Sequence, residues 1–344
     1  MATYYIGADV HSNNTELAIE NRRKIMARYS VPTTIPAIST VLDSLQGKKY
    51  FAMEEGPMAG WLYRNLNKKV DEFIVSDPRR NKLITSDGDK DDKIDAAKLA
   101  VLLRGEFLKP VHHTDDSDRA HLKHWVNLYH DRVRDAVRHI NKIRACCRMH
   151  GAAIPRKVVR IKKHRHEWLS GFSNTVLKDQ LHMLWIGYDA TKEQVKIAEK
   201  QLSSQGSKYQ IINHWRNLAG VGLIRSVTIF AYLDTPWRFK KRSKLHKYCG
   251  VGLERSTSGR DKKGKLKPTR LKLPWAVNRR LKNAVLGAAT TAIYQKDNIF
   301  KDYYERMLSN GINPVNARHS VARKMVSVMS AMWRTGSLFD EQLF

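Results

Sequence analysis

The order of extended and helical segments in the first hundred residues most constrains how this chain can fold. Alternating apolar residues predict five strands, at residues 3–9, 16–20, 24–31, 49–54 and 72–76. Helical spacing of apolar residues predicts helices between the third and fourth strands, between the fourth and fifth, and after the fifth. Three strands in succession, followed by alternating helices and strands, predict an α/β domain.

This order is that of the ribonuclease-H-like fold, in which the first and fourth strands lie side by side at the centre of one sheet. Each of these two predicted strands ends in an acidic residue, Asp9 and Glu54. Their carboxylates are therefore expected to be neighbours at one end of the sheet. Glu55 directly follows Glu54 and is the alternative acidic residue at the end of this strand.

A run of five aspartates within residues 87–95 precedes an Ala/Leu-rich helix. Asp92 and Asp95 are three residues apart, so both carboxylates lie on one face of the first turn. Such a pair alone is explained by the helix dipole, which favours acidic residues at a helix N-terminus. Together with Asp9 and Glu54, it predicts four converging carboxylates. Two Mg²⁺ ions about 3.5–4 Å apart, as in two-metal phosphoryl transfer, need such a set of ligands.

The excess positive charge lies in the rest of the chain. Residues 1–120 carry 18 lysines and arginines and 18 aspartates and glutamates, so the formal net charge of +29 arises from residues 121–344. A field of this sign indicates a polyanionic partner. Nucleic acid fits better than an anionic membrane, because no amphipathic membrane helix or lipidation motif accompanies the charge.

The basic residues expected to bind a phosphate backbone form two groups. One group lies in a Pro-containing connector at residues 151–165, and the other lies at residues 255–282, where eleven basic residues accompany one acidic residue. The candidates are Arg156, Lys157, Arg160, Lys162, Lys163, Arg255, Arg260, Lys262, Lys263, Lys265, Lys267 and Arg270. The alternative is a basic surface without a ligand.

Apolar residues at helical spacing predict further helices at residues 117–150, 166–202, 281–294 and 314–333. The second of these is expected to form a coiled-coil arm for dimerisation or an ordinary helical linker. Between apolar helices, Ala219-Gly-Val-Gly222 is similar to a helix–hairpin–helix turn, whose backbone N–H groups bind phosphate. A tight interhelical turn is the alternative.

The composition argues against several other classes of protein. Three cysteines, two of them adjacent, do not form a disulfide framework or a zinc pattern. No apolar run reaches the length of a membrane span, and the first residues lack the features of a signal peptide. These features predict an intracellular protein that does not bind membranes.

Nearly the whole chain resembles transposases of the IS110 family, which are related to the Piv DNA invertases. The N-terminal half is similar to the family's RuvC-like domain with its Asp-Glu-Asp-Asp tetrad, in Ile6-Gly-Ala-Asp9, Met53-Glu54 and Lys90-Asp-Asp92-Lys-Ile-Asp95-Ala96. The family usually has Thr-Gly after the glutamate, whereas this chain has Glu55-Gly56, so Glu55 stays open as a ligand. The C-terminal half is similar to the family's transposase domain, in Ala219-Gly-Val-Gly222, Tyr248-Cys-Gly-Val-Gly-Leu253 and Ser258-Gly259.

The resemblance implies three regions: a RuvC-like catalytic domain at 1–150, a basic connector with a helical or coiled-coil arm at 151–208, and a mainly α-helical transposase domain at 209–344. It implies that the tetrad Asp9, Glu54, Asp92 and Asp95 binds two Mg²⁺ ions, for which Mn²⁺ is a possible substitute. It also implies that Ser258 attacks DNA to form a covalent phosphoserine intermediate, with Ser256 as the alternative nucleophile.

Further implied partners are donor and target DNA, a structured bridge RNA that guides the enzyme, and other copies of the chain in a homodimer or homotetramer. The expected location is the cytoplasm of a bacterium or archaeon, at the nucleoid. Two other functions stay open. One is a RuvC-like nuclease or Holliday-junction resolvase that uses water as the nucleophile. The other is a non-catalytic nucleic-acid-binding protein, which leaves the four acids unexplained.

Overall fold

The chain forms two compact units, Met1–Ala120 and His121–Phe344. The computed structural model describes residues 2–80, 92–256 and 270–344. Within these ranges, only the backbone is described for Arg80, Asp92, Lys93, Arg255, Ser256, Arg270 and Leu343. The boundary between the two units lies inside helix α5 (Ser117–Met149). The boundary predicted from the sequence was at residue 150.

The first unit is built on one five-stranded sheet in the order β3-β2-β1-β4-β5. The strands are β1 (Thr3–Val10), β2 (Asn14–Asn21), β3 (Lys24–Pro32), β4 (Lys48–Glu54) and β5 (Glu72–Ser76). β1 pairs antiparallel with β2 and parallel with β4, and β4 pairs parallel with β5. The predicted pairing of the first and fourth strands at the centre of the sheet is therefore confirmed.

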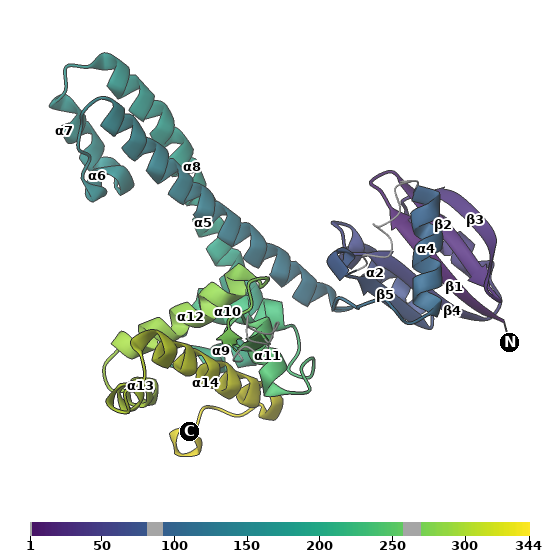
Figure 1. Cartoon of the computed structure of the whole chain (residues 1–344). Helices are drawn as coiled ribbons and strands as arrows, with labels where there is room; N and C mark the ends of the chain where they lie inside the picture. Colours follow the sequence, from purple (N-terminus) through teal and green to yellow (C-terminus); the bar gives the residue numbers. More distant parts are fainter. Residues whose placement is uncertain (1, 81–91, 257–269) are drawn as a thin grey trace, which may run out of the picture. The chain divides into compact units, whose positions relative to one another are not determined.

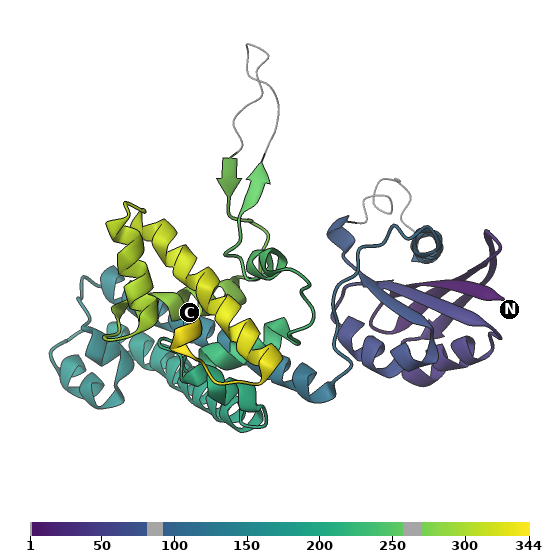
Figure 2. The same cartoon turned by 90° about the horizontal axis from the view of Figure 1, so that it is seen from below.

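Helices cover both faces of this sheet (Figure 2). On one face, α1 (Ile35–Asp43) and α2 (Ala59–Leu66) enclose a core that includes Ile6, Phe51 and Met53. On the other face, α4 (Asp92–Arg104) packs its leucines on Ala52, with the half-buried Tyr5 and Tyr50 beside them. Successive side chains of a strand point to opposite faces of the sheet. Every second residue therefore faces α4, and the residues between them face α1 and α2.

Two contacts fix the position of α4 on the sheet. A Cβ atom on Gly7 of β1 would stand 2.1 Å from the carbonyl oxygen of Ala96, so the helix backbone lies directly on the strand. At the other end of α4, Arg104 bonds to Glu20 of β2, whose side chain is buried. Because Glu20 pairs with Tyr5, near the start of β1, α4 runs antiparallel to β1. The first turn of α4 therefore lies toward the carboxyl end of β1.

In the second unit, α5 and α8 (Thr175–Gly206) lie side by side as a helical hairpin (Figure 1). The short helices α6 (Arg156–Arg160) and α7 (Arg165–Ser170) lie at its end. A small core that includes Val159, Leu181 and Trp185 holds these helices together. Helix 117–150 is thus confirmed.

The prediction of one continuous helix over residues 166–202 is wrong. The helical conformation stops at Gly171, and α8 begins after Asn174, whose side chain accepts a bond of 3.0 Å from the Leu177 N–H. An asparagine N-cap of this kind satisfies a backbone donor that a continuous helix would bond internally.

The remaining helices pack around one apolar core. They are α9 (Gln210–Arg216), α10 (Leu223–Leu233), α11 (Arg242–Tyr248), α12 (Arg279–Tyr294), α13 (Ile299–Ser309) and α14 (Pro314–Thr335). At the centre of this core, the fully buried Trp215 packs on Phe230 and donates a hydrogen bond of 3.0 Å to the carbonyl oxygen of Met329. The predicted helices 281–294 and 314–333 are confirmed.

Smaller elements complete the chain. β6 (Glu254–Ser256) and β7 (Arg270–Lys272) form a two-stranded antiparallel sheet that the sequence did not predict. Short 3₁₀ helices lie at Asn67–Lys69, Pro78–Arg80, Lys162–His164 and Glu341–Leu343. Among the helices described, none combines the length and the apolar character that crossing a membrane requires.

Candidate active site and nucleic-acid interface

Asp9 and Glu54 occupy equivalent positions on the two central parallel strands. Ala8 of β1 pairs with Met53 of β4, so Asp9 and Glu54 are the next residues along the two strands. Asp9 follows Gly7 by two residues and Glu54 follows Ala52 by two, and Gly7 and Ala52 both contact α4. By strand alternation, both acids lie on the α4 side of the sheet.

Helix α4 places Asp95 at the same end of the sheet. Asp95 directly precedes Ala96, whose carbonyl oxygen lies against Gly7, two residues before Asp9. Asp95 is partly exposed, so its carboxylate is accessible to solvent. Asp92 opens α4 at this end, but its side chain lies outside the described part. Three of the four predicted acids therefore come from three elements that meet at one place.

Glu55 lies in a different environment from Glu54. Its Oε2 atom is 2.6 Å from Nε2 of His113, in the segment after β5. The His113 ring lies 5.8 Å from the ring of Tyr63, on helix α2. Glu55 is thus engaged on the α2 side of the sheet, whereas Glu54 faces α4. This separation favours Glu54 over Glu55 as the second acid of the tetrad.

A fifth carboxylate, which was not predicted from the sequence, lies close to this group. Glu16 on β2 pairs directly with Asp9, so both side chains point to the same face of the sheet. Glu16 is 8% exposed, and its Oε1 accepts hydrogen bonds from Asn14 and Ser30. A count of residues across the turn that joins β1 to β2 could have found this pairing. Nε2 of His11 also lies 3.2 Å from Oδ2 of Asp9.

Carboxylate oxygens at the ends of β1, β4 and α4 are the donor type that a hard divalent cation takes. The residues present therefore fit Mg²⁺ in chemistry and in the elements that carry them. Among the residues with described side chains, no three histidine, cysteine, aspartate or glutamate side chains already form a metal-sized cluster.

The basic connector presents its cations to solvent. Val158 and Val159 are buried in the core of the hairpin, which leaves the other face of α6 exposed. All five predicted cations of this segment are exposed: Arg156, Lys157, Arg160, Lys162 and Lys163. They form a positively charged surface at the end of the hairpin.

The second predicted group lies largely outside the described residues. Arg255 and Arg270 belong to β6 and β7, where only their backbone is described, as is that of Ser256. Ser258, Arg260, Lys262, Lys263, Lys265 and Lys267 all fall within residues 257–269, which are outside the described part.

The two glycines of the Gly-Val-Gly turn have different environments. Gly220 has φ +78°, and a Cβ there would lie 2.2 Å from the carbonyl oxygen of Ala288, so close packing on α12 explains this glycine. Gly222 begins α10 without a side-chain cap, and nothing lies within 4 Å of its Cβ position. Gly222 and Arg216 both line a cavity of about 510 Å³.

Comparisons with known proteins agree with these features. A family model described as a transposase, of the DEDD type of IS110, matches residues 6–150. A second, described as "Transposase IS116/IS110/IS902 family", matches residues 214–305. A relative from Sinorhizobium fredii (strain NBRC 101917 / NGR234), named "Putative transposase y4qE", is 26% identical over 297 residues, which are 84% of this chain and 72% of the relative. The chain belongs to the IS110 family of transposases.

Proposed function

We propose that this transposase is a metal-dependent DNA recombinase that cuts and rejoins strands through a covalent bond between DNA and Ser258. The observation that carries the proposal is the placement of Asp9, Glu54 and Asp95. They lie on one side and at one end of the sheet, although they come from three separate elements. An acidic helix start explains Asp95 alone, but it does not explain the two strand ends beside it.

In this proposal Asp9, Glu54, Asp92 and Asp95 hold two Mg²⁺ ions. When bound, the ions supply positive charge that stabilises the phosphoryl group under attack. The carboxylates orient the ions, and the central pair of strands fixes the spacing between Asp9 and Glu54. Gly7 allows α4 to lie close enough to bring Asp95 to that pair.

The Ser258 hydroxyl then forms a bond to a DNA phosphorus atom. The phosphodiester loses one P–O bond to the deoxyribose, whose oxygen leaves as a hydroxyl and takes up a proton, while the serine hydroxyl loses one. A hydroxyl of the incoming strand attacks the phosphoserine, which restores a phosphodiester and the free serine. Ser256 is the alternative nucleophile.

The same proposal includes a bridge RNA that pairs with donor and target DNA. One protein that holds an RNA and two duplexes needs extended cationic surface, and the net charge of +29 supplies it. The exposed cations of α6 are one such surface. The basic residues from 255 to 270 are proposed as another.

We also propose that the chain assembles through α8. Val176, Met183, Ala190 and Ile197 recur every seven residues along this helix, and all four are exposed. Ile186 adds an exposed apolar side chain three residues after Met183. A seven-residue apolar repeat on the solvent face of a long helix is typical of coiled-coil pairing, here with a second copy in a dimer or tetramer.

The test is strand cleavage and exchange on DNA that carries the ends of the element and a target. Ser258→Ala is expected to abolish the covalent protein–DNA adduct on denaturing gels and the cleavage with it, whereas Ser256→Ala retains both. Asp9→Ala abolishes cleavage by either mechanism. If Ser258→Ala cleaves at the wild-type rate, the serine mechanism is wrong and a nuclease that uses water remains.

Sequencing the RNA that co-purifies with the protein tests the guide. The expected result is one discrete structured RNA, encoded beside the gene. Random cellular RNA would contradict this part of the proposal.

A further inference from the structure

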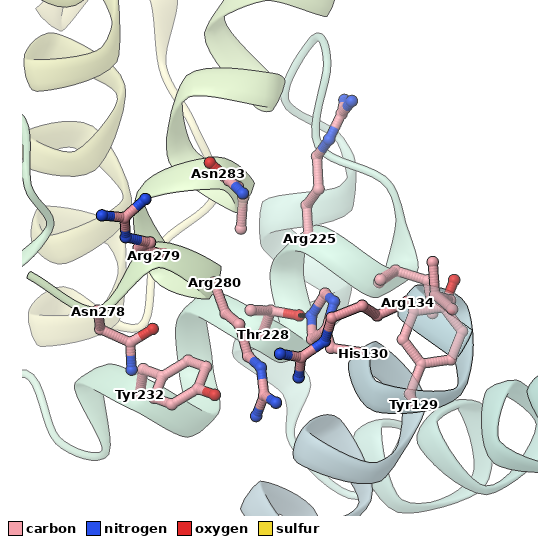
Figure 3. Close-up of a pocket in the computed structure, with 13 residues that line it drawn as sticks. Tyr129, His130, Arg134, Arg225, Thr228, Tyr232, Asn278, Arg279, Arg280 and Asn283 are labelled. Atoms are coloured by element: carbon pink, nitrogen blue, oxygen red, sulfur yellow. Dashed lines mark hydrogen bonds between the residues drawn. The ribbon is translucent and has the colours of Figure 1, made fainter. Parts of the chain in front are cut away.

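The second unit contains a cleft of about 770 Å³ between α5, α10 and the start of α12 (Figure 3). Four arginines line it, Arg134, Arg225, Arg279 and Arg280, and none of the thirteen lining residues is acidic. The other lining residues include tyrosine, threonine and asparagine side chains, which also bond to phosphate oxygens. This composition suits an anionic ligand with several oxygen atoms.

Two of these arginines share one carboxylate behind the cleft. Arg280 donates to Oδ1 of Asp131 at 2.6 Å and to Oδ1 of Asn127 at 2.6 Å, and Tyr232 also donates to Asn127. Arg134 bonds to the same Asp131 oxygen, and Figure 3 shows the guanidinium groups of Arg134 and Arg280 next to each other. One aspartate thus serves two cations, which leaves a net positive charge.

His130 lines the cleft near the same arginines. Its Nε2 atom is 3.0 Å from the hydroxyl oxygen of Thr228. Burial, together with the positive charges of Arg280 and Arg134, lowers its pKa, because both disfavour the protonated ring. The floor of the cleft is therefore positively charged without a contribution from His130.

The start of α12 adds to this positive field. Arg279 and Arg280 occupy its first turn, which contains no acidic residue, although a helix N-terminus carries positive partial charge. Arg280 shares Asp131 with Arg134. Arg279 is exposed, and within the described part of the chain its guanidinium meets an aromatic ring rather than a carboxylate.

That ring belongs to Trp275, which is 87% exposed. The guanidinium carbon of Arg279 lies 6.0 Å from the centre of the ring, so the tryptophan stands beside the cationic edge of the cleft. An open indole face next to arginines is the arrangement with which proteins stack an unpaired base while they bind its phosphates.

We infer that this cleft binds the backbone of an unpaired nucleic-acid strand, and that Trp275 stacks on one of its bases. The inference rests on the proposed role in nucleic-acid recombination, but it does not depend on the carboxylate tetrad or on Ser258. Arg134 and Arg279 bind the phosphates, and Arg280, held by Asp131 and Asn127, positions Arg134 through their shared carboxylate. The strand is DNA or RNA, since the two share the backbone charge and base faces that the cleft recognises.

The test measures binding of a labelled 20-nucleotide DNA, and of the RNA with the same sequence, to the full chain by fluorescence anisotropy. Divalent ions are left out, so the result is independent of the tetrad. The variants are Arg134→Gln, Arg279→Gln, Trp275→Ala and Trp275→Phe. The control is Arg306→Gln, which removes the same charge from an exposed position on α13 that does not line the cleft.

Each cleft arginine variant is expected to weaken binding about threefold to tenfold and to lower the slope of log affinity against log salt by about 0.7. Trp275→Ala is expected to weaken binding at least about fivefold, and Trp275→Phe to restore most of it, because a phenyl ring still stacks. The strand, DNA or RNA, for which the cleft variants lose more affinity is identified as the ligand.

Three outcomes would overturn the inference. One is unchanged affinity of all cleft variants for both strands. Another is an equal loss in the Arg306→Gln control, which would indicate a general charge effect. The third is normal binding by Trp275→Ala, which would remove the stacking step. Asp9→Ala is expected to lose cleavage but to bind the labelled strand normally. Cleavage by this variant tests the recombinase proposal and strand binding by the cleft variants tests the cleft, so the failure of one proposal can be distinguished from the failure of the other.

Discussion

Gly7 and Ala96 approach each other so closely that a methyl group on Gly7 would stand 2.1 Å from the Ala96 carbonyl oxygen. This contact sets the distance between the backbones of β1 and α4. Asp9 lies two residues after Gly7, and Asp95 lies one residue before Ala96. The close approach therefore also sets how near the first and last acids of the proposed tetrad come.

Gly7→Ala is expected to destabilise the first unit by about 2 kcal/mol or more, because the added methyl collides with helix backbone, which cannot swing away as a side chain can. Unfolding in urea measures the change. Gly56→Ala is the matched control, since nothing lies within 4 Å of its Cβ position, and its effect should stay within about 0.5 kcal/mol. Equal stability of the two variants would contradict the packing described for α4.

Glu54→Gln is expected to lower DNA cleavage at least about a hundredfold, because it replaces a charged ligand on the α4 side of the sheet with a neutral amide. Glu55→Gln alters a contact with His113 on the other side, so it should cost less than about tenfold. Both variants are compared in one cleavage assay at equal protein concentration. A larger loss for Glu55→Gln would transfer the ligand role to Glu55.

Gly220→Ala is expected to cost about 2 kcal/mol or more of unfolding free energy. Its positive φ disfavours any side chain, and the methyl would meet the carbonyl oxygen of Ala288 at 2.2 Å. Gly222→Ala, two residues along the same turn, faces open space and should cost less than about 1 kcal/mol. Thermal unfolding of the two variants measures the difference. A large loss for Gly220→Ala alone indicates that Gly220 is needed for packing on α12, whereas equal and small losses would leave it only a role in binding.

Acid should destabilise the second unit through two histidines. Burial, aided by neighbouring arginines, lowers the pKa of His130 and of His246, whose ordinary value is 6.5. Below pH 6.5 the unfolded chain takes up protons at these positions and the folded chain does not, so the free energy of unfolding falls as the pH falls. Both rings are partly solvated, so the decrease from pH 7 to pH 5.5 should be at most about 1 kcal/mol for each histidine.

The measurement is the midpoint of unfolding in urea at pH 7 and at pH 5.5. The wild type is compared with a double variant that carries His130→Gln and His246→Gln. The double variant should lose less stability on acidification than the wild type. An equal or larger loss would show that other groups cause the acid sensitivity.

Met183→Glu with Ile186→Glu is expected to shift the chain toward monomer, because each places a charge on the exposed apolar stripe of α8. Light scattering after gel filtration measures the mass. Ser203→Glu adds a charge to the same helix outside the stripe and should leave the mass unchanged. An unaltered mass in the double variant would contradict pairing through α8.

Much of the first unit could be predicted because its signals are local. Alternating apolar residues revealed all five strands, and their order with the helices determined that β1 lies beside β4. Asp9 and Glu54 followed from their places at strand ends. The partner of Glu55 could not be predicted, because His113 approaches it from a segment far along the chain, and no local pattern encodes that contact.

The second unit was harder to predict. The end of α7 at Ser170 and the start of α8 after Asn174 interrupt an otherwise helical apolar pattern, and the start of α8 is fixed by one capping bond. The cleft was missed because α5, α10 and α12 contribute its residues, and their faces become known only when the helices are packed. Glu16 was missed for the same reason, because its position beside Asp9 depends on the register between β1 and β2.

The crossing of α4 over β1 has a consequence for the protein during its synthesis. The sheet strands leave the ribosome before residues 92–104, so a chain that stops short of α4 has Asp9 and Glu54 but lacks Asp95. Such a fragment also leaves Tyr5, Tyr50 and Ala52 uncovered, and chaperones and proteases recognise apolar surface of this kind. A prematurely terminated chain therefore lacks one acid of the proposed metal site and exposes apolar surface, and the absence of one helix causes both.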